Sequence, residues 1–213
     1  SSVRRIFNTV SHQAADHLCQ GVPGNEDGWN GSNIRIDAPV PAILIPRDPL
    51  TKMISGLVRN GVENTPDGGM IDVAVKQVGD DVHFIIHDHG VGITEEHRKH
   101  IFEGFFPTQE TDAYCTGHPF DFNAGGKGAD LLRMKIFSER FHFRLDMESE
   151  RCPHIPGEND VCPGSVDRCD ACAGADECAG SGGTVFTVIF PVSQEGNGLK
   201  EGAQHAEAQH RTD

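Results

Sequence analysis

The sequence lacks any apolar run that approaches the roughly 20 residues needed to span a bilayer as a helix. Its first residues also lack the apolar segment and the small-residue cleavage site of a secretory signal peptide. Together these absences predict a cytoplasmic chain that does not itself cross a membrane.

Basic and aromatic residues are scarce. The chain of 213 residues has 18 Lys and Arg against 32 Asp and Glu, a formal net charge of −14, one Trp and one Tyr. Phosphate backbones and anionic membrane surfaces repel such a chain, and it offers few rings on which single strands could stack. We therefore expect no nucleic-acid partner. A nucleotide remains possible, because it needs only a local pocket of backbone amides, a lysine and a metal ion.

The seven cysteines are unevenly spread. Cys19 and Cys115 stand alone, whereas the other five lie within one short segment: Cys152, Cys162, Cys169, Cys172 and Cys178. An odd total without a signal peptide does not match a secreted disulfide framework. The cluster is therefore a local feature of an otherwise reduced protein.

Composition and hydrophobic spacing divide the chain into three parts. Residues 1–33 combine an amphipathic helix over 1–20 with a linker rich in Gly, Asn and Asp. That helix packs either on its own domain or along a dimer or coiled-coil seam. Residues 34–192 form the folded domain, and 193–213 are expected to be a disordered tail.

Within the folded domain, the hydrophobic periodicity and the capping and turn residues predict the helices and strands. The long helix has Asp48 as its N-cap and Pro49 in its first position, and the hairpin turns at Gly79 and Asp80. The remaining elements are strands at 34–36, 43–45, 141–147 and 184–190, and helices near 95–102 and 128–140. This order predicts a two-layer α/β (α+β) sandwich with a mixed, mostly antiparallel sheet covered by helices on one face.

Three separated motifs have the residue types that a nucleotide needs. Asn60 lies on the long helix in LVRNGVENTPDGG, and its amide oxygen suits a Mg²⁺ shell. DHGVGI begins with Asp88 at a strand end, where a carboxylate can accept the exocyclic amine of adenine. NAGGKGADLL, residues 123–132, enters a helix, whose N-terminal amides and dipole favour phosphates.

In this order and at these separations, the motifs resemble the ATP-binding catalytic domain of sensor histidine kinases. That domain is part of a superfamily shared with gyrase, Hsp90 and MutL. LVRNGVENTPDGG resembles the N box, DHGVGI the first glycine box and GGKGADLL the second. IFEGFF (101–106) resembles the F box, and GGTVFTVIFP (182–191) resembles the closing strand.

The resemblance implies a Bergerat-type ATP-binding fold with a mobile lid over residues 94–125. It implies Mg²⁺ held through ATP by Asn60, which is also the expected catalytic residue. The implied nucleotide-binding residues are Asn60, Asn64, Asp88, Gly90, Gly92, Ile93, Gly126, Lys127, Gly128, Ala129, Leu131 and Thr184.

The implied reaction transfers the γ-phosphoryl of Mg·ATP to a histidine outside this sequence. His12 lies in SHQAAD, where Gln13 stands in place of the acidic residue that directly follows the histidine of the family's H box, and no proline occurs in the next turn. The implied partners are a histidine-containing dimerisation domain of the same protein and a downstream response regulator receiver domain. The chain would then be the cytoplasmic domain of a sensor that a membrane can anchor.

Some positions depart from the family pattern. Gly56 stands where many of these kinases have an Asn, Glu63 and Asn64 replace a common Lys-Tyr pair, and Asp130 replaces a glycine of the second glycine box. These departures support an alternative, a non-catalytic nucleotide-sensing module of the same fold. An ATPase of the superfamily is a weaker alternative, because its general-base Glu would be at Gly56.

The five clustered cysteines belong to a predicted insertion, residues 150–182, between two paired strands. Cys169 and Cys172 have CxxC spacing, which suits a structural Zn²⁺ site or, with less support, an Fe–S cluster. Disulfides or a redox pair, and a loop without a ligand, are the alternatives. We expect a metal held by a subset of the five. Histidines 83, 87, 97 and 100 are expected at the surface, and His89 near the nucleotide pocket.

Overall fold

The computed structural model describes residues 32–36, 40–103, 129–157 and 160–192. These residues contain a five-stranded sheet in the order β1-β2-β3-β5-β4. The strands are β1 (Ser32–Ile36), β2 (Ile71–Val78), β3 (Asp81–Asp88), β4 (Arg144–Glu150) and β5 (Gly183–Pro191). β1 pairs with β2 in parallel, and the other pairs are antiparallel. The predicted helix over 1–20, the linker up to residue 31 and the tail after 192 lie outside the described residues, whereas residues 32 and 33 of the predicted linker belong to β1.

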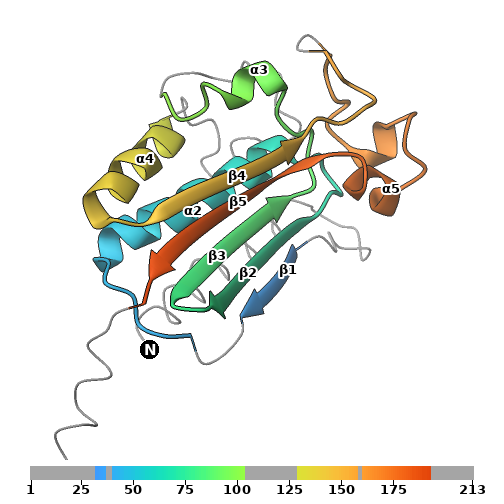
Figure 1. Ribbon diagram of the computed structural model, residues 1–213. Coiled ribbons are helices and arrows are strands. Elements are labelled where there is room, and N and C mark those ends of the chain that lie inside the picture. Colours follow the sequence, from blue (N-terminus) through green and yellow to red (C-terminus); the bar gives the residue numbers. More distant parts are fainter. Residues whose placement is uncertain (1–31, 37–39, 104–128, 158–159, 193–213) are drawn as a thin grey trace, which may run out of the picture.

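The two longer helices lie on the same face of this sheet (Figure 1). They are α2 (Arg47–Asn64) and α4 (Ala129–Phe141), and the short helices are α3 (Glu95–Arg98) and α5 (Ala175–Ala179). The predicted two-layer α/β sandwich with helices on one face is therefore confirmed. Within the described ranges, no helix is both long enough and apolar enough to cross a bilayer.

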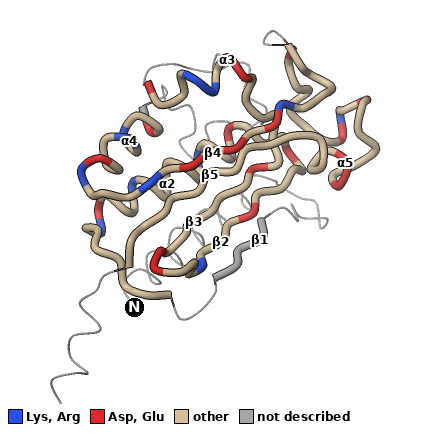
Figure 2. Tube along the Cα trace, viewed as in Figure 1, with Lys and Arg blue, Asp and Glu red and all other residues tan. Residues whose placement is uncertain are grey.

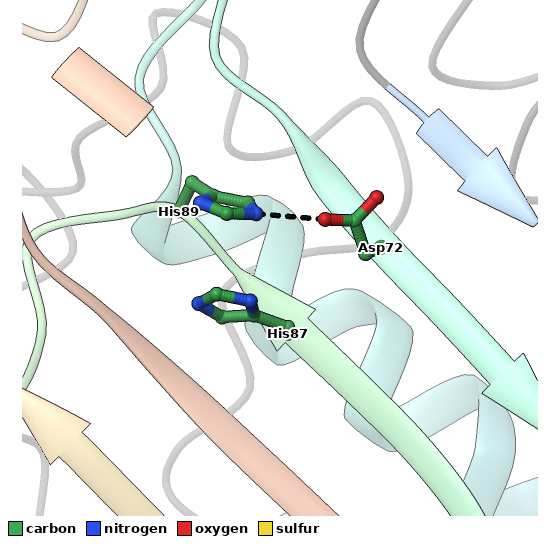
Figure 3. A group of neighbouring side chains, drawn as sticks. All are labelled: Asp72, His87 and His89. Atoms are coloured by element: carbon green, nitrogen blue, oxygen red, sulfur yellow. Dashed lines mark hydrogen bonds and ion pairs between the residues drawn. The ribbon is translucent and has the colours of Figure 1, made fainter. Parts of the chain in front are cut away.

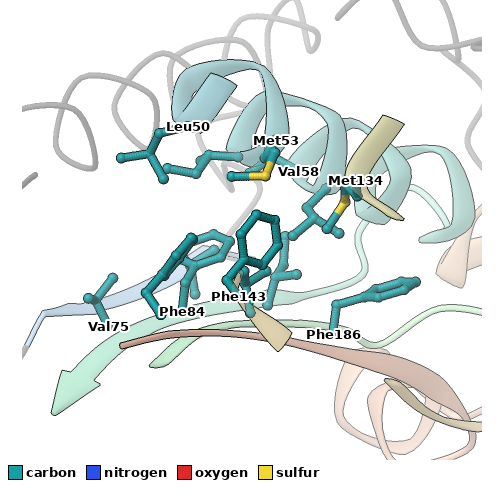
Figure 4. Close-up of a cluster of buried hydrophobic side chains, with 14 of the residues drawn as sticks. Leu50, Met53, Val58, Val75, Phe84, Met134, Phe143 and Phe186 are labelled. Carbon is teal, nitrogen blue, oxygen red and sulfur yellow. The ribbon is translucent and has the colours of Figure 1, made fainter. Parts of the chain in front are cut away.

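The hydrophobic core lies between α2, α4 and the inner face of the sheet (Figure 4). Alternate residues of β3 and β5 point into it, as the period of two in a strand requires. The apolar residues of α2 recur every three or four positions, which gives that helix one continuous buried face. The largest fully buried side chains are Phe84, Leu50, Met53, Leu57, Ile71, Ile86, Met134, Val75, Val82 and Val188.

The residues next to α2 explain where the helix begins and ends, although the predicted N-cap residue is wrong. Pro46, not Asp48, is the N-cap residue, and no side chain caps the helix there. Asp48 instead forms an ion pair with Lys52, with 2.8 Å between Oδ2 and Nζ. At the other end, Thr65 is extended because it precedes Pro66, which disfavours helical backbone at the residue before it.

Two strand predictions also need correction. Residues 43–45 do not form a strand, since Ile43 makes only an isolated bridge to Val192. The strand predicted at 141–147 begins three residues later, because His142 has a positive φ of 56° that separates it from α4. The hairpin turn at Gly79 and Asp80 and the helix near 128–140 are confirmed.

The cysteine-bearing segment, residues 151–182, connects β4 to β5. Because Glu150 and Gly183 are register partners, the segment leaves and re-enters the sheet at one end. We call it the β4–β5 connection. It contains α5 and a short 3₁₀ helix over Val166–Arg168.

Candidate functional site

Asp88 is the last residue of β3 and points toward the helices. Its side chain is 3% exposed, and its Oδ1 atom is buried without a hydrogen-bond partner. Burial raises the pKa of Asp88 to about 7, although backbone N–H groups of Gly90 and Thr184 oppose this rise. An acceptor without a partner, at the end of a buried strand, is the feature that a ligand donor would satisfy.

The turn after Asp88 depends on two glycines. A Cβ atom at Gly90 would overlap the carbonyl of Asn64, which accepts a 3.1 Å hydrogen bond from the Val91 amide. Gly92 has φ +65°, and a Cβ there would overlap the carbonyl of Glu150. Both positions therefore need glycine, since backbone approaches backbone too closely for a side chain.

The first motif meets the second at the end of α2. Asn60 and Asn64 are half-buried one turn apart, and the Asn64 side-chain amide donates to the Asn60 carbonyl at 2.7 Å. A Cβ atom at Gly61 would lie 3.5 Å from the Cβ of Asp88. Asn60, the predicted Mg²⁺ ligand, is therefore adjacent in sequence to Gly61. Gly61 packs against Asp88, the residue predicted to bind adenine.

The third motif, residues 123–132, contacts α2 about one turn before Asn60. Gly126, Lys127 and Gly128 lie outside the described residues, and Ala129 is the first residue of α4. Leu131 is half-buried against the core, and Thr184 is buried beside Asp88 on β5. Of the predicted lid, residues 94–103 are described and include α3, and Ile93 precedes them.

Gly56 contacts the start of α4. A Cβ atom at Gly56 would lie 3.3 Å from the Cβ of Asp130. The Asp130 carboxylate accepts from Arg59 at 3.3 Å and from Arg133 at 2.7 Å. The two departures from the family pattern, Gly56 and Asp130, therefore face each other.

Two residues that the sequence analysis missed hold the turn at Gly90 and Gly92, called the glycine turn below, in place. The Ser149 hydroxyl accepts from the Ile93 amide at 2.8 Å and donates to the Gly183 carbonyl at 3.0 Å. The Arg151 guanidinium donates to the Gly92 carbonyl at 3.2 Å. Neither residue belongs to a motif, and only the pairing of β4 with β5 brings them to the turn.

His89 is not where the sequence predicted it. Its ring faces away from Asp88, and its nitrogens contact the Ala179 carbonyl at 2.9 Å and an Asp72 carboxylate oxygen at 2.8 Å. Strand alternation explains the error, because neighbours of an inward-facing Asp88 point to the opposite face. His87, expected at the surface, is half-buried.

The β4–β5 connection packs on the same end of the sheet. The Cys152 amide donates to the Val91 carbonyl at 2.9 Å, and the Val166 amide donates to the Asp67 carbonyl at 2.9 Å. With the contact from His89 to Ala179, these bonds attach the connection at three places around the glycine turn.

The five clustered cysteines gather inside this connection. Burial, together with the neighbouring thiols of Cys169 and Cys178, raises the pKa of Cys172 to about 12. Burial also raises the pKa of Cys178, and Cys162, Cys169 and Cys152 add to that rise. Each thiolate would repel the others, so the group carries negative charge only when a cation compensates it.

Comparisons with known proteins agree with this geometry. A family model described as "Histidine kinase-, DNA gyrase B-, and HSP90-like ATPase" matches residues 46–194, more than half of the chain. Sporulation kinase A of Bacillus subtilis (strain 168) is 35% identical over 83 residues, which are 38% of this chain and 14% of that protein. The chain thus spans a small part of this relative.

Two solved structures share the fold. A mycobacterial sensor histidine kinase, MprB, has a TM-score of 0.57 at 14% identity, covering 89% of this chain and 94% of that one. Full-length ShkA in complex with AMPPNP has a TM-score of 0.57 at 15% identity, covering 90% of this chain and 30% of that one.

Proposed function

The chain belongs to the family of histidine kinase-, DNA gyrase B- and HSP90-like ATPases, and we propose that it is the catalytic ATP-binding domain of a sensor histidine kinase. The observation that carries the proposal is the buried Asp88 carboxylate, whose Oδ1 has no partner at the end of β3. An adenine amine would supply the missing donor, and Gly90 and Gly92 would let the ring approach the backbone. The Sporulation kinase A match and the kinase folds of MprB and ShkA support the same function.

Mg²⁺ is the metal ion that this site would use with ATP. Asn60 offers a neutral amide oxygen from the α2 turn beside Asp88, which suits a hard cation that keeps phosphate oxygens and waters as its other ligands. Bound Mg²⁺ would neutralise phosphate charge. Gly126, Lys127, Gly128 and Ala129 are proposed to hold the phosphates, and Asn64, Ile93, Leu131 and Thr184 to complete the pocket.

The domain's own contribution to transfer is positioning. It would hold the γ-phosphoryl in line with a histidine of a separate dimerisation domain, and a response regulator would then accept the group. Incubating the protein with γ-labelled ATP and that histidine-containing segment tests the proposal. Label on the segment's histidine is expected, whereas nucleotide binding without any labelled segment would favour the alternative below.

A non-catalytic nucleotide-sensing module is the second candidate, and one observation favours it. The space beside Gly56, where related kinases have an Asn side chain, is occupied by Asp130. The Asp130 carboxylate is ion-paired to Arg59 and Arg133 and offers no donor to phosphate, where an amide would donate. This candidate keeps ATP binding at Asp88 and loses transfer.

We predict that Asn60→Ala removes the Mg²⁺-dependent part of ATP affinity and leaves the fold intact. The side chain is half-buried on α2, so its loss creates little cavity. Calorimetric titration of ATP with and without Mg²⁺ measures the effect. The parent should bind more tightly with Mg²⁺ than without it, and the variant should show no difference. An unchanged Mg²⁺ dependence would assign the metal to another group.

We also propose that a subset of Cys152, Cys162, Cys169, Cys172 and Cys178 binds a metal, Zn²⁺ in preference to an Fe–S cluster. Besides burial, neighbouring thiols raise the pKa of Cys172 and of Cys178, which supports their proximity. A bound cation would favour their deprotonation. Among the described residues, no three of these sulfurs lie within 4.8 Å of one another. The sulfurs would therefore have to move closer together to share one ion.

For this thiol site we predict about one equivalent of cysteine-bound metal in protein purified anaerobically. The Cys169→Ser, Cys172→Ser double variant should lose it, since a structural site needs four ligands. Elemental analysis provides the measurement, and Ser165→Ala in the same connection serves as the control. A parent that holds no more metal than the double variant, with all its thiols titratable, would instead indicate a redox pair or a loop without a ligand.

A further inference from the structure

Asp72, His87 and His89 form a group of polar side chains on the sheet face opposite to α2 and α4. Asp72 on β2 and His87 on β3 are register partners, so both point to this face. His89 follows the end of β3 and points the same way. Figure 3 shows the two imidazoles beside each other, with Asp72 reaching across from the neighbouring strand.

The spacing of these three side chains suits a single metal ion. One ring nitrogen of each histidine and one carboxylate oxygen of Asp72 all lie within 4.8 Å of one another. No other such group of three occurs in the described part of the chain. With metal–ligand bonds of about 2.0–2.2 Å, neighbouring ligands of a tetrahedral ion lie about 3.3–3.6 Å apart. Small side-chain rotations would bring the three atoms to that separation.

The hydrogen bonds of His89 identify the nitrogen that would bind. Nδ1 lies 2.9 Å from the Ala179 carbonyl, so it must carry a proton to donate there. Nε2 then holds the lone pair of a neutral ring, yet it lies 2.8 Å from an Asp72 carboxylate oxygen, which only accepts. Two acceptors face each other unless a second proton or a metal ion lies between them. A ring whose other nitrogen donates to a carbonyl is the usual arrangement of a metal-binding histidine.

We propose that Asp72, His87 and His89 bind one divalent transition-metal ion of the Zn²⁺ class, with the remaining coordination position open to water. Two imidazole nitrogens and one carboxylate oxygen suit borderline ions such as Zn²⁺ over Ca²⁺ or Mg²⁺. The side chains of His89 and Asp72 are 13% and 38% exposed, so an ion can enter from solvent.

The surrounding charge also favours a cation. β4 is an edge strand of the same sheet, and three of its four exposed residues are acidic: Asp146, Glu148 and Glu150, with Arg144 as the fourth. Figure 2 shows acidic residues along β4. Glu148 and His87 both pair with Val185, which places Glu148 two strands from the group. Acidic side chains at this range raise the local concentration of cations.

This site is distinct from both sites proposed above. His87 and His89 flank Asp88 in sequence but lie on the opposite face of the sheet, so the ion would bind behind the nucleotide pocket. The thiols belong to the β4–β5 connection, whose Ala179 carbonyl lies 2.9 Å from His89 Nδ1.

Zn²⁺ titration of the full chain tests the proposal. In the parent protein, the imidazole nitrogen resonances of His87 and His89 should shift on binding. Equilibrium dialysis should give one equivalent more for the parent than for Asp72→Asn or His87→Gln, with at least a tenfold loss of affinity. His83→Gln is the matched control, since His83 lies on the same face of β3 opposite Lys76, and it should bind like the parent.

Co²⁺ separates this site from the thiols, because thiolate ligands give intense charge-transfer absorption and histidine and carboxylate ligands do not. Asp72→Asn should lose the d–d bands of the histidine and carboxylate site and keep both the charge-transfer and the d–d absorption of any thiolate site. Unshifted His87 and His89 resonances in the parent, or Zn²⁺ held only by cysteines, would overturn the proposal. The parent resonances decide the matter even where a variant fails to fold.

Discussion

Asp88→Asn is expected to stabilise the nucleotide-free protein at pH 8 by up to about 4 kcal/mol. Burial raises the pKa of Asp88 from 3.8 to about 7, and each unit corresponds to about 1.36 kcal/mol. Between pH 4 and 7 the folded protein keeps a proton that the unfolded chain releases, so stability falls as the pH rises. Asn carries no charge and avoids this loss.

The difference between variant and parent should therefore be small below pH 4 and reach its full size above pH 7. Urea unfolding at several pH values, without nucleotide, measures it. Asp81→Asn is the matched control, because Asp81 begins the same strand but is half-exposed and ion-paired to Arg144 at 2.9 Å. Parallel pH profiles for Asp88→Asn and the parent would show that Asp88 ionises normally.

Gly92→Ala is expected to cost on the order of 3–5 kcal/mol of unfolding free energy, whereas Gly79→Ala should cost about 1–2 kcal/mol. Both glycines have positive φ values, +65° and +60°, so both variants incur the left-handed backbone penalty. A Cβ atom at Gly92 would also overlap the Glu150 carbonyl, whereas one at Gly79 meets nothing within 4 Å. The difference isolates the close approach of the glycine turn to the end of β4.

Thermal or urea unfolding of both variants tests this pair. Gly92→Ala should also weaken ATP binding, because the turn after Asp88 must shift to admit the methyl group. Equal losses of stability in the two variants would mean that the backbone near Glu150 moves aside easily.

The sequence predicted most of the fold because its strongest patterns are local. The helical spacing of α2, the hairpin between β2 and β3, and the closing strand β5 each appear in a single window. Two boundaries were missed because their causes are not visible in the pattern. His142 adopts a positive φ that delays β4, and Ile43 has one bridge partner, Val192, from the far end of the chain.

The candidate nucleotide site was predicted less completely, and long-range pairing explains the difference. Asp88 and its glycines stand in one motif, whereas Ser149 and Arg151 reach them only through β4. The group of Asp72, His87 and His89 was missed for the same reason. The register of β2 against β3 brings Asp72 to His87, and no spacing of residues along one strand reveals that pairing.

The role of Asp88 as the adenine acceptor can be measured by calorimetric titration of Mg·ATP and Mg·GTP into the parent and Asp88→Asn at pH 8. The parent should prefer ATP, because the ionised carboxylate accepts from the amine of adenine and repels the carbonyl of guanine. Asp88→Asn should bind ATP about 10- to 100-fold more weakly, the loss of one charge-assisted hydrogen bond, and lose its preference over GTP. Equal ATP affinities for the two proteins would contradict the assignment of Asp88 to the adenine pocket.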